Sequence, residues 1–194
     1  MLPKPGLTGV LVVEPAHTST TRGSRVGGLP TAGDEFSWPQ CADHHAPMQF
    51  TAQFDLGDVL YLAFFCEADP YECASWNPDR GNNAVLVVPV SDNLAIVDAP
   101  TRIVPPPIDP MTLTLIECPA DQLRPALLDA RSHGVQAVGY WGGPAEWIQD
   151  DETPSGTTYF AQIFGFEPLD IFFDAAGYFF VSDDRTFGKT LWQT

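Results

Sequence analysis

Prolines and glycines occur along the whole chain, and they constrain its fold more than any other feature. The 194 residues include 19 prolines and 16 glycines. Proline lacks a backbone donor and interrupts helices, and glycine is most useful where the backbone turns. Such punctuation favours many short strands joined by turns over long helices. We therefore expect an α+β fold of mainly antiparallel sheets, with one or two helices.

Hydrophobic periodicity identifies the strands. Residues 48–56 alternate between apolar and polar side chains, which is typical of a strand with one buried face. Residues 59–65 and 84–90 are denser apolar runs that suit central strands. Residues 7–13 and 111–117 complete the set of expected strands.

One helix is expected, over residues 119–132. Leu123, Leu127 and Leu128 mark one apolar face of this segment, and Gly134 supplies a stop signal. It is the only convincing helical pattern that we find in the sequence.

Two parts of the chain repeat the same series of features. Each has a glycine pair with a proline, then a tryptophan, then an aromatic-x-Ala-Gln strand, then an aromatic-rich strand. Chance similarity between β-rich sequences is the alternative explanation. The shared order leads us to predict two diverged copies of one β-rich unit. The matched segments are 27–30, Trp38, 50–53 and 60–65 in the first copy, and 142–144, Trp147, 159–162 and 177–181 in the second.

A proline-rich connector separates the two copies. Residues 100–110 contain five prolines, so this stretch suits neither a helix nor an inner strand. We predict a single domain over residues 1–194, whose halves at about 7–98 and 111–194 are joined by a connector at 99–110.

These repeated motifs also carry a resemblance. The pattern from Gly27 to Gln53 and the second pattern at 142–154 resemble those of the YwqG-like domain-of-unknown-function family of bacteria, over roughly residues 9–193. That domain is similar to the one in eukaryotic programmed-cell-death-two proteins, which act as dedicated chaperones for a basic small-subunit ribosomal protein. The resemblance implies an α+β fold with two β-rich halves and no known enzymatic activity.

Three cysteines and a histidine have the spacing of a metal site. Cys41 and His44 belong to one turn, Cys66 ends an expected strand, and Cys73 follows after six residues. Two ligands on a turn plus two at a strand end are typical of a ribbon-type zinc site, here Cys₃His. Buried thiols or a disulfide between Cys66 and Cys73 are the alternatives, and His45 competes with His44. Some relatives implied by the resemblance carry cysteines at all four positions, which favours structural zinc.

The charge of the chain restricts its partners. Its 25 acidic and 9 basic residues give a formal net charge of −16. A field of this sign repels phosphate backbones and anionic lipid surfaces, so we expect neither nucleic-acid nor membrane binding. It suits a basic protein or peptide partner, although acidity also serves solubility alone. With no signal-peptide pattern and four cysteines, we predict a reducing location, the cytoplasm.

Catalytic machinery is sparse. The four histidines are His17, His44, His45 and His133, and no phosphate-binding glycine motif precedes a helix. The acidic run 150–152 is a candidate for hard-cation binding or general-base chemistry, although such runs are usually solvated turns. We expect a protein that is not an enzyme, and the alternative is a metal-dependent hydrolase that uses residues 150–152.

The leading functional prediction is a protein- or peptide-binding domain, chaperone-like or of the immunity type. A groove between the halves, rimmed by Trp141 and Trp147, could hold an extended basic segment by strand addition. Gln53 and Gln162 lie in mid-strand and are further candidates for partner contact. The alternative for each glutamine is solvent exposure or a hydrogen bond to a neighbouring loop.

Overall fold

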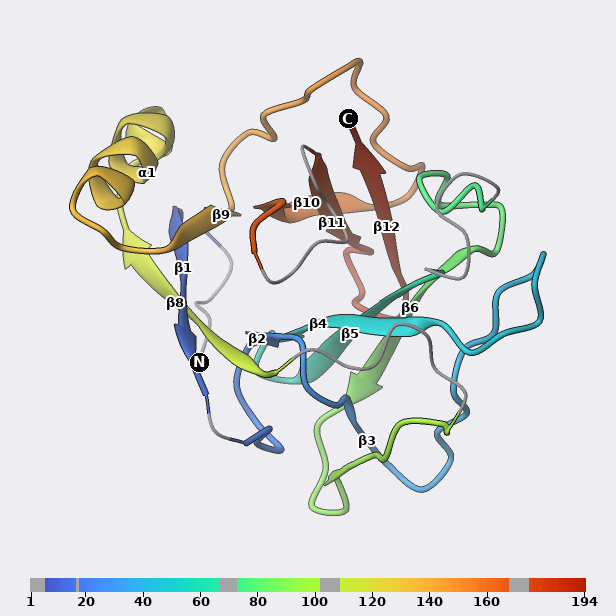
Figure 1. Ribbon diagram of the computed structural model, residues 1–194. Helices are drawn as coiled ribbons and strands as arrows, with labels where there is room; N and C mark the ends of the chain where they lie inside the picture. The colour runs from blue at the N-terminus through green and yellow to red at the C-terminus, as the bar shows by residue number, and fades with distance from the viewer. Residues whose placement is uncertain (1–5, 17, 67–72, 102–108, 168–174) are drawn as a thin grey trace.

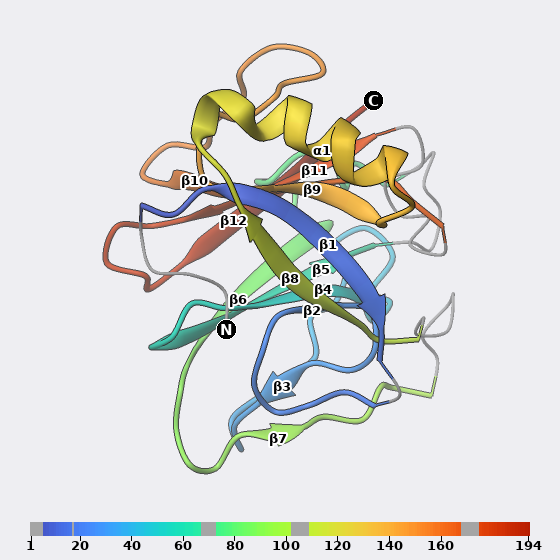
Figure 2. The same ribbon diagram turned by 90° about the vertical axis from the view of Figure 1, so that its left-hand side faces the viewer.

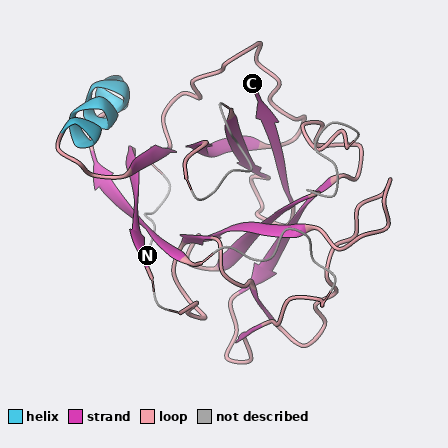
Figure 3. Cartoon of the chain, in the orientation of Figure 1, coloured by secondary structure: helices cyan, strands magenta, loops and turns pink. Residues whose placement is uncertain are grey.

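A ten-stranded antiparallel sheet dominates the computed structural model, which describes residues 6–16, 18–66, 73–101, 109–167 and 175–194. The strand order is β12-β11-β10-β9-β1-β8-β2-β4-β5-β6, and β3 and β7 form a separate two-stranded sheet. One short α-helix accompanies the strands (Figure 3), so the predicted α+β class with mainly antiparallel sheets is confirmed. The strands are β1 (Gly9–Pro15), β2 (Arg25–Val26), β3 (Thr31–Ala32), β4 (Gln49–Asp55), β5 (Val59–Phe65), β6 (Asn83–Pro89), β7 (Ala95–Ile96), β8 (Met111–Glu117), β9 (Ala137–Trp141), β10 (Thr158–Phe164), β11 (Ala176–Val181) and β12 (Gly188–Gln193).

The large sheet curves so strongly that its two edge strands, β6 and β12, approach each other (Figure 1). Gly188 makes this approach possible, because a Cβ there would clash with the side chains of Tyr61 and Val85. The Tyr61 hydroxyl donates a hydrogen bond to the carbonyl of Lys189 across the same junction. The main apolar core fills the enclosed space, with buried side chains from β1, β4, β5, β9, β10 and β11.

The predicted residue bounds of the strands were accurate, but one strand was predicted at the wrong place in the order of the sheet. The bounds of β5 and β8 agree with the predicted 59–65 and 111–117, and β1, β4 and β6 are shifted by only one or two residues. β5 is central, between β4 and β6, but β6 is an edge strand, so its prediction as a central strand was wrong. Its apolar run has another cause: Val85 and Val87 pack on the main core, while Leu86 and Val88 pack on a second core outside the sheet.

The predicted helix is present as a short 3-10 turn, Ala120–Gln122, followed by α1, Leu123–Ser132. It lies across β1 and β9 (Figure 2), where Leu123 and Leu127 are buried. Leu128 is 56% exposed, so its assignment to the apolar face was wrong; one residue further on, the side chain has turned about 100° away. Gly134, at φ +78°, follows the helix as expected. Within the described residues, no helix combines the length and apolar character that crossing a bilayer requires.

The two glycine pairs have closely similar backbone geometry. All four glycines of Gly27-Gly28 and Gly142-Gly143 have φ between +63° and +71°, a backbone conformation that residues with a side chain rarely adopt. The first glycine of each pair donates its N–H to a carbonyl 2.8 Å away, that of Thr51 in β4 and that of Phe160 in β10. Both acceptors lie at bulges, where the pairing register skips one residue. Each glycine pair therefore forms a tight turn that is fastened to the bulge of a neighbouring strand.

The halves are interlocked within the sheet. β1, from the first half, pairs with β9 of the second, and β8, from the second half, pairs with β2 of the first. β1 and β8 also pair with each other at the centre. Descent of the halves from one duplicated unit stays a prediction. Of the expected connector at 99–110, residues 102–108 lie outside the described residues.

Candidate metal centre

The four predicted metal ligands meet at one place. Cys41, His44, Cys66 and Cys73 each offer a ligand atom, and these atoms all lie within 4.8 Å of one another. The three cysteines are at most 3% exposed, while His44 is half-buried. No disulfide joins Cys66 to Cys73, so that alternative is not what this structure contains.

A tight turn presents the first two ligands. The N–H of His45 donates to the carbonyl of Cys41 at 2.9 Å, and the N–H of Cys41 donates to Ala46 at the same distance. His45 takes up the bend in a left-handed conformation with φ +52°. The sulfur of Cys41 and Nδ1 of His44 are thereby held 3.4 Å apart. His44 is the histidine that joins the cluster; His45 is not part of it.

The beginning of β6 fastens the turn to the strand that supplies Cys66. Gly81 accepts a hydrogen bond from the N–H of Ala42, and Asn82 accepts one from the N–H of Cys66, both at 2.9 Å. Asn82 is fully buried, and its side-chain amide donates to the carboxylate of Asp43 at 2.6 Å. The ligand turn, the end of β5 and the start of β6 therefore form one connected unit.

The distances fit a tetrahedral zinc ion. Zinc bonds of about 2.3 Å to sulfur and about 2.0–2.1 Å to nitrogen give tetrahedral edges of about 3.8 Å between two sulfurs and about 3.5 Å between sulfur and nitrogen. Cys41 and Cys73 have their sulfurs 3.6 Å apart. Nδ1 of His44 lies 3.4 Å from the sulfur of Cys41 and 3.6 Å from that of Cys66. The cluster is therefore compatible with a zinc site in both donor chemistry and spacing.

Proton affinities differ within the cluster. Burial acts to raise the pKa of the Cys41 thiol, but hydrogen bonds with Cys66 and His44 outweigh it and lower that pKa to about 7. Burial raises the pKa of Cys73, and the neighbouring sulfurs of Cys66 and Cys41 raise it further. Three sulfurs this close disfavour three negative charges by themselves. A bound dication would remove that repulsion, since it favours the thiolate form of each ligand.

The two mid-strand glutamines hold loops. The amide oxygen of Gln53 accepts from the N–H of Thr31 at 3.1 Å, and its nitrogen donates to the carbonyl of Gly23 at 3.0 Å. Gln162 makes the same kind of pair with the backbone of Glu146, at 2.9 and 2.8 Å. Both glutamines are fully buried. The alternative prediction, a hydrogen bond to a neighbouring loop, is what the structure contains, and a partner cannot reach these side chains directly.

The tryptophans proposed to rim a groove take up packing positions. Trp141 is only 5% exposed and lies in the main core against Phe54 and Phe160. Trp147 stacks on Tyr178 with ring centroids 4.5 Å apart. The curvature of the sheet turns Trp141 inward, yet Trp141 also lines a second, smaller pocket of about 300 Å³ together with Leu56 and Tyr159.

The acidic run 150–152 is an exposed loop in which two of the three carboxylates accept hydrogen bonds. The carboxylate of Asp151 accepts hydrogen bonds from the hydroxyl and the N–H of Thr153, which lower its pKa. Glu152 accepts from the side chain of Gln193 at 3.1 Å. Among the described residues, the Cys/His cluster is the one group of three or more potential metal ligands. His17, another titratable candidate, lies outside the described residues.

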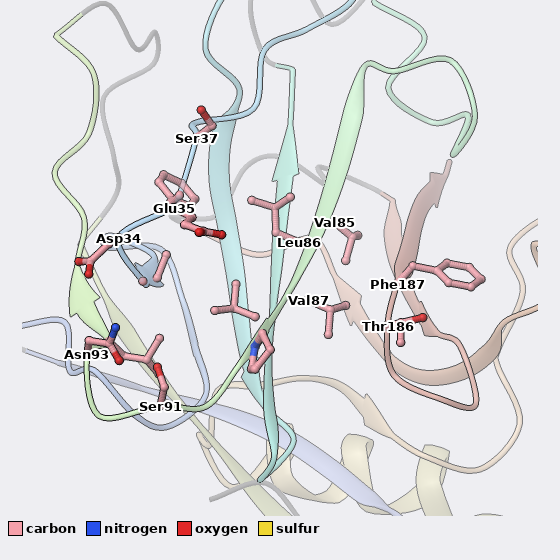
Figure 4. A pocket seen from close by; sticks show the side chains of 16 residues that line it. Asp34, Glu35, Ser37, Val85, Leu86, Val87, Ser91, Asn93, Thr186 and Phe187 are labelled. Carbon is pink, nitrogen blue, oxygen red and sulfur yellow. The ribbon is translucent and has the colours of Figure 1, made fainter.

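A groove along β6 was missed from the sequence. It has a volume of about 790 Å³ and extends from Asp34 and Phe36, past the apolar residues 85–88, to Thr186 and Phe187 (Figure 4). The assignment of 84–90 as a central strand concealed it. Pro89 was the available signal, since proline within a strand points to an edge.

Comparison with protein-family models, with curated proteins and with solved structures gives no match to this chain.

Proposed function

We propose that this chain is a cytoplasmic protein- or peptide-binding domain, built around a structural zinc ion and directed toward a basic partner. The groove along β6 is the observation that carries the proposal. Its lining includes Asp34 and Glu35 but no lysine or arginine, in a chain of net charge −16. A groove of this composition favours a positively charged segment.

A structural role for zinc follows from the number of ligands. Cys41, His44, Cys66 and Cys73 would fill the four positions of a tetrahedral ion, so no position would remain for water or substrate. Catalytic zinc sites keep such a position open. The ion would instead stabilise the junction of the ligand turn with β5 and β6.

A binding role also agrees with the shortage of catalytic groups. In the candidate acidic run 150–152, Asp151 is hydrogen-bonded within its own turn and Glu152 accepts from Gln193. Gln53 and Gln162 are bonded to loops. The chaperone-like and immunity-type variants both remain within this proposal, as does the YwqG-like resemblance. A toxin gene next to the gene of this protein would favour immunity, and ribosomal genes would favour chaperoning.

Elemental analysis tests the metal. Protein purified without a histidine tag should contain close to one zinc per chain, and Cys73→Ala should lose most of it. Cys118→Ala is the matched control, since Cys118 is outside the cluster. Less than about 0.1 zinc per chain in freshly purified protein would contradict the zinc proposal.

Affinity capture tests the partner class. Immobilised protein should enrich basic proteins from the native lysate at low salt, and the enrichment should fall as salt rises because exposed charges are screened. Absence of any basic protein, or a capture that does not depend on salt, would contradict the proposal.

A further inference from the structure

We infer that the free edge of β6 is the docking site, and that the occupant is an extended, basic segment of another protein that adds to the sheet as an eleventh strand. This inference rests on the proposed binding function and names its site. Strand addition supplies affinity through main-chain hydrogen bonds and specificity through pockets for alternate side chains.

Two hydrogen bonds show which residues of β6 face β5. The N–H of Cys66 donates to the carbonyl of Asn82, and the N–H of Val90 donates to the carbonyl of Asp58, both at 2.9 Å. Antiparallel pairs alternate between residues that exchange both hydrogen bonds and residues that exchange none. Even-numbered residues of β6 therefore bond to β5.

The odd-numbered residues direct their backbone groups away from the sheet. Val85 and Val87 each place an N–H and a C=O on this outer side, and within the described residues no strand pairs with β6 there. Pro89 offers only its carbonyl, which also sets one end of the site. An added strand can thus form up to four hydrogen bonds with Val85 and Val87.

Apart from Pro89 at its end, the edge lacks the devices that usually prevent strand addition. Natural edge strands carry charged side chains, bulges or covering loops. Residues 85–88 are all apolar and half-buried, and their pairing with β5 is regular throughout. The opposite edge, β12, differs: it carries Lys189, and its Gln193 side chain bonds to Gln149 and Asp150 of the loop beside it.

Two walls would receive the alternating side chains of an added strand. Phe36 and Leu94 lie on the side of Leu86, where the second core begins. Phe187, 43% exposed, lies on the other side of β6 near Val85 (Figure 4). Apolar residues at every second position of the segment suit these walls.

Charge selects between a basic segment and a second copy of this chain. Asp34 and Glu35 are exposed on the rim of the groove, and neither forms an ion pair with a described residue. Pairing of β6 with β6 of a second copy would bring two chains of charge −16 and two such rims together. A segment with lysine or arginine meets the same rim favourably.

The probe is a capped ten-residue peptide that alternates lysine with valine. We expect it to bind, and to slow amide hydrogen exchange of Val85 and Val87 at least tenfold at saturation, measured by NMR. A peptide with glutamate in place of lysine should bind at least tenfold more weakly, as should one with a proline at its centre, because proline removes the N–H that pairs with the edge.

Val87→Pro tests the edge in the protein itself. The substitution removes an outward N–H and blocks the ladder, yet edge strands tolerate proline at such positions. We expect at least tenfold weaker peptide binding with unchanged zinc content, and a lower unfolding temperature with the cooperative transition retained, because Val87 also packs on the main core. The charge-reversed Asp34→Lys/Glu35→Lys protein should also bind the lysine peptide at least tenfold more weakly at low salt. Its matched control, Glu117→Lys/Asp129→Lys, reverses two exposed acidic residues far from β6 and should bind normally.

Each other outcome overturns the inference in a recognisable way. Peptide binding that survives Val87→Pro would place the site elsewhere and leave the proposed binding function intact. No binding of the lysine peptide up to about 1 mM would reject the groove for basic segments, and capture of basic proteins from the lysate would then decide the proposed function separately. A dimer that Val87→Pro converts to a monomer would identify a second copy as the occupant.

Discussion

The two halves of this protein use the same strand geometry but hold their loops by different chemistry. Each has a tryptophan and an aromatic strand residue packed on a phenylalanine of the next strand. Trp38 and Phe50 lie 5.6 and 5.5 Å from Phe64 between ring centroids. Trp147 and Tyr159 lie 6.1 and 6.0 Å from Phe180.

The segment that joins the glycine pair to β4 in the first half, and to β10 in the second, distinguishes the halves. In the first half, Cys41 and His44 of this loop join the sulfur cluster. In the second, the loop is held by the hydroxyl of Tyr178, which donates to the carbonyl of Glu146 and accepts from the N–H of Ile148.

Loop length offers a physical reason for this difference. Gly28 and Gln53 are 25 positions apart, whereas Gly143 and Gln162 are 19 apart. A longer loop loses more entropy when it is ordered, so a metal clip gains most there. Four tests address this contrast.

Metal removal should have the largest effect and should act on the first half. Structural zinc contributes about 10–16 kcal/mol in small zinc-binding peptides, so we expect chelation to destabilise this chain by about 5 kcal/mol or more. Thermal unfolding with and without a strong chelator measures it. Hydrogen exchange should accelerate first around Cys41 and Asn82, while the loop after Gly143 stays protected. An unfolding temperature that is indifferent to chelation would show that the cluster does not hold the first half together.

The matched glutamines come next. Gln53→Met and Gln162→Met each remove two hydrogen bonds to a loop and leave at least one backbone N–H, that of Thr31 or of Glu146, without its acceptor, which should cost about 2–4 kcal/mol. Because zinc would also hold the first loop, the loss for Gln53→Met should be the smaller one in zinc-loaded protein. The loss of stability caused by Gln53→Met should grow after chelation, whereas the loss caused by Gln162→Met should not. Denaturant unfolding of both variants measures this, and equal responses to chelation would contradict the proposed division of roles.

Acid sensitivity should be greatest in the first half, because Asp55 is buried, whereas Asp151 and Asp184 of the second half, whose pKa values hydrogen bonds also lower, are exposed. Burial acts to raise the pKa of Asp55, but hydrogen bonds from Arg22 and from the N–H groups of Gly23 and Gly57 outweigh it and lower that pKa. A lowered pKa in the folded state means that Asp55 stabilises the fold above its unfolded pKa of about 3.9, and that this contribution is lost as pH falls through the folded value.

Asp55→Asn should therefore cost about 2 kcal/mol near pH 7 and flatten the fall in stability below about pH 4. Unfolding measured from pH 7 to pH 3 gives both values. The corresponding β10 residue, Phe164, does not titrate, so Phe164→Leu is the control and should leave the pH profile unchanged. A pH dependence in Asp55→Asn as steep as in the original protein would count against this assignment.

The smallest effect should come from Leu128 on the outer face of the helix, an element that only the second half carries. Leu128→Ala removes an exposed side chain and should change stability by less than about 0.5 kcal/mol. Leu127→Ala, the buried neighbour, should cost about 2–4 kcal/mol. Similar losses for the two would mean that the outer face of α1 is covered.

Much of the local structure could be predicted from the sequence. Alternating and apolar runs located β4, β5 and β8 within a residue or two, because side-chain periodicity reports which faces are buried. The metal ligands could also be predicted from the sequence, because Cys41 and His44 share a turn and Cys66 ends a strand. These are relations between neighbours in the chain.

Contacts between segments that lie far apart in the sequence could not be predicted from it. Trp141 and Gln53 were candidates for partner contact, and only the tertiary structure shows that Trp141 packs in the core and that Gln53 bonds to a loop. The exchange of β1 and β8 between the halves likewise depends on pairing across the chain.

β6 shows most clearly which features the sequence determines and which depend on the tertiary structure. Its residues determine an apolar strand with both faces covered, and Pro89 determines where that strand ends. Whether another strand pairs with its outer side is a matter of backbone hydrogen bonding, which every residue except proline offers alike. Tertiary structure alone left the N–H and C=O groups of Val85 and Val87 without a neighbouring strand among the described residues, and in the same way it alone brought the sulfur of Cys73 to that of Cys41.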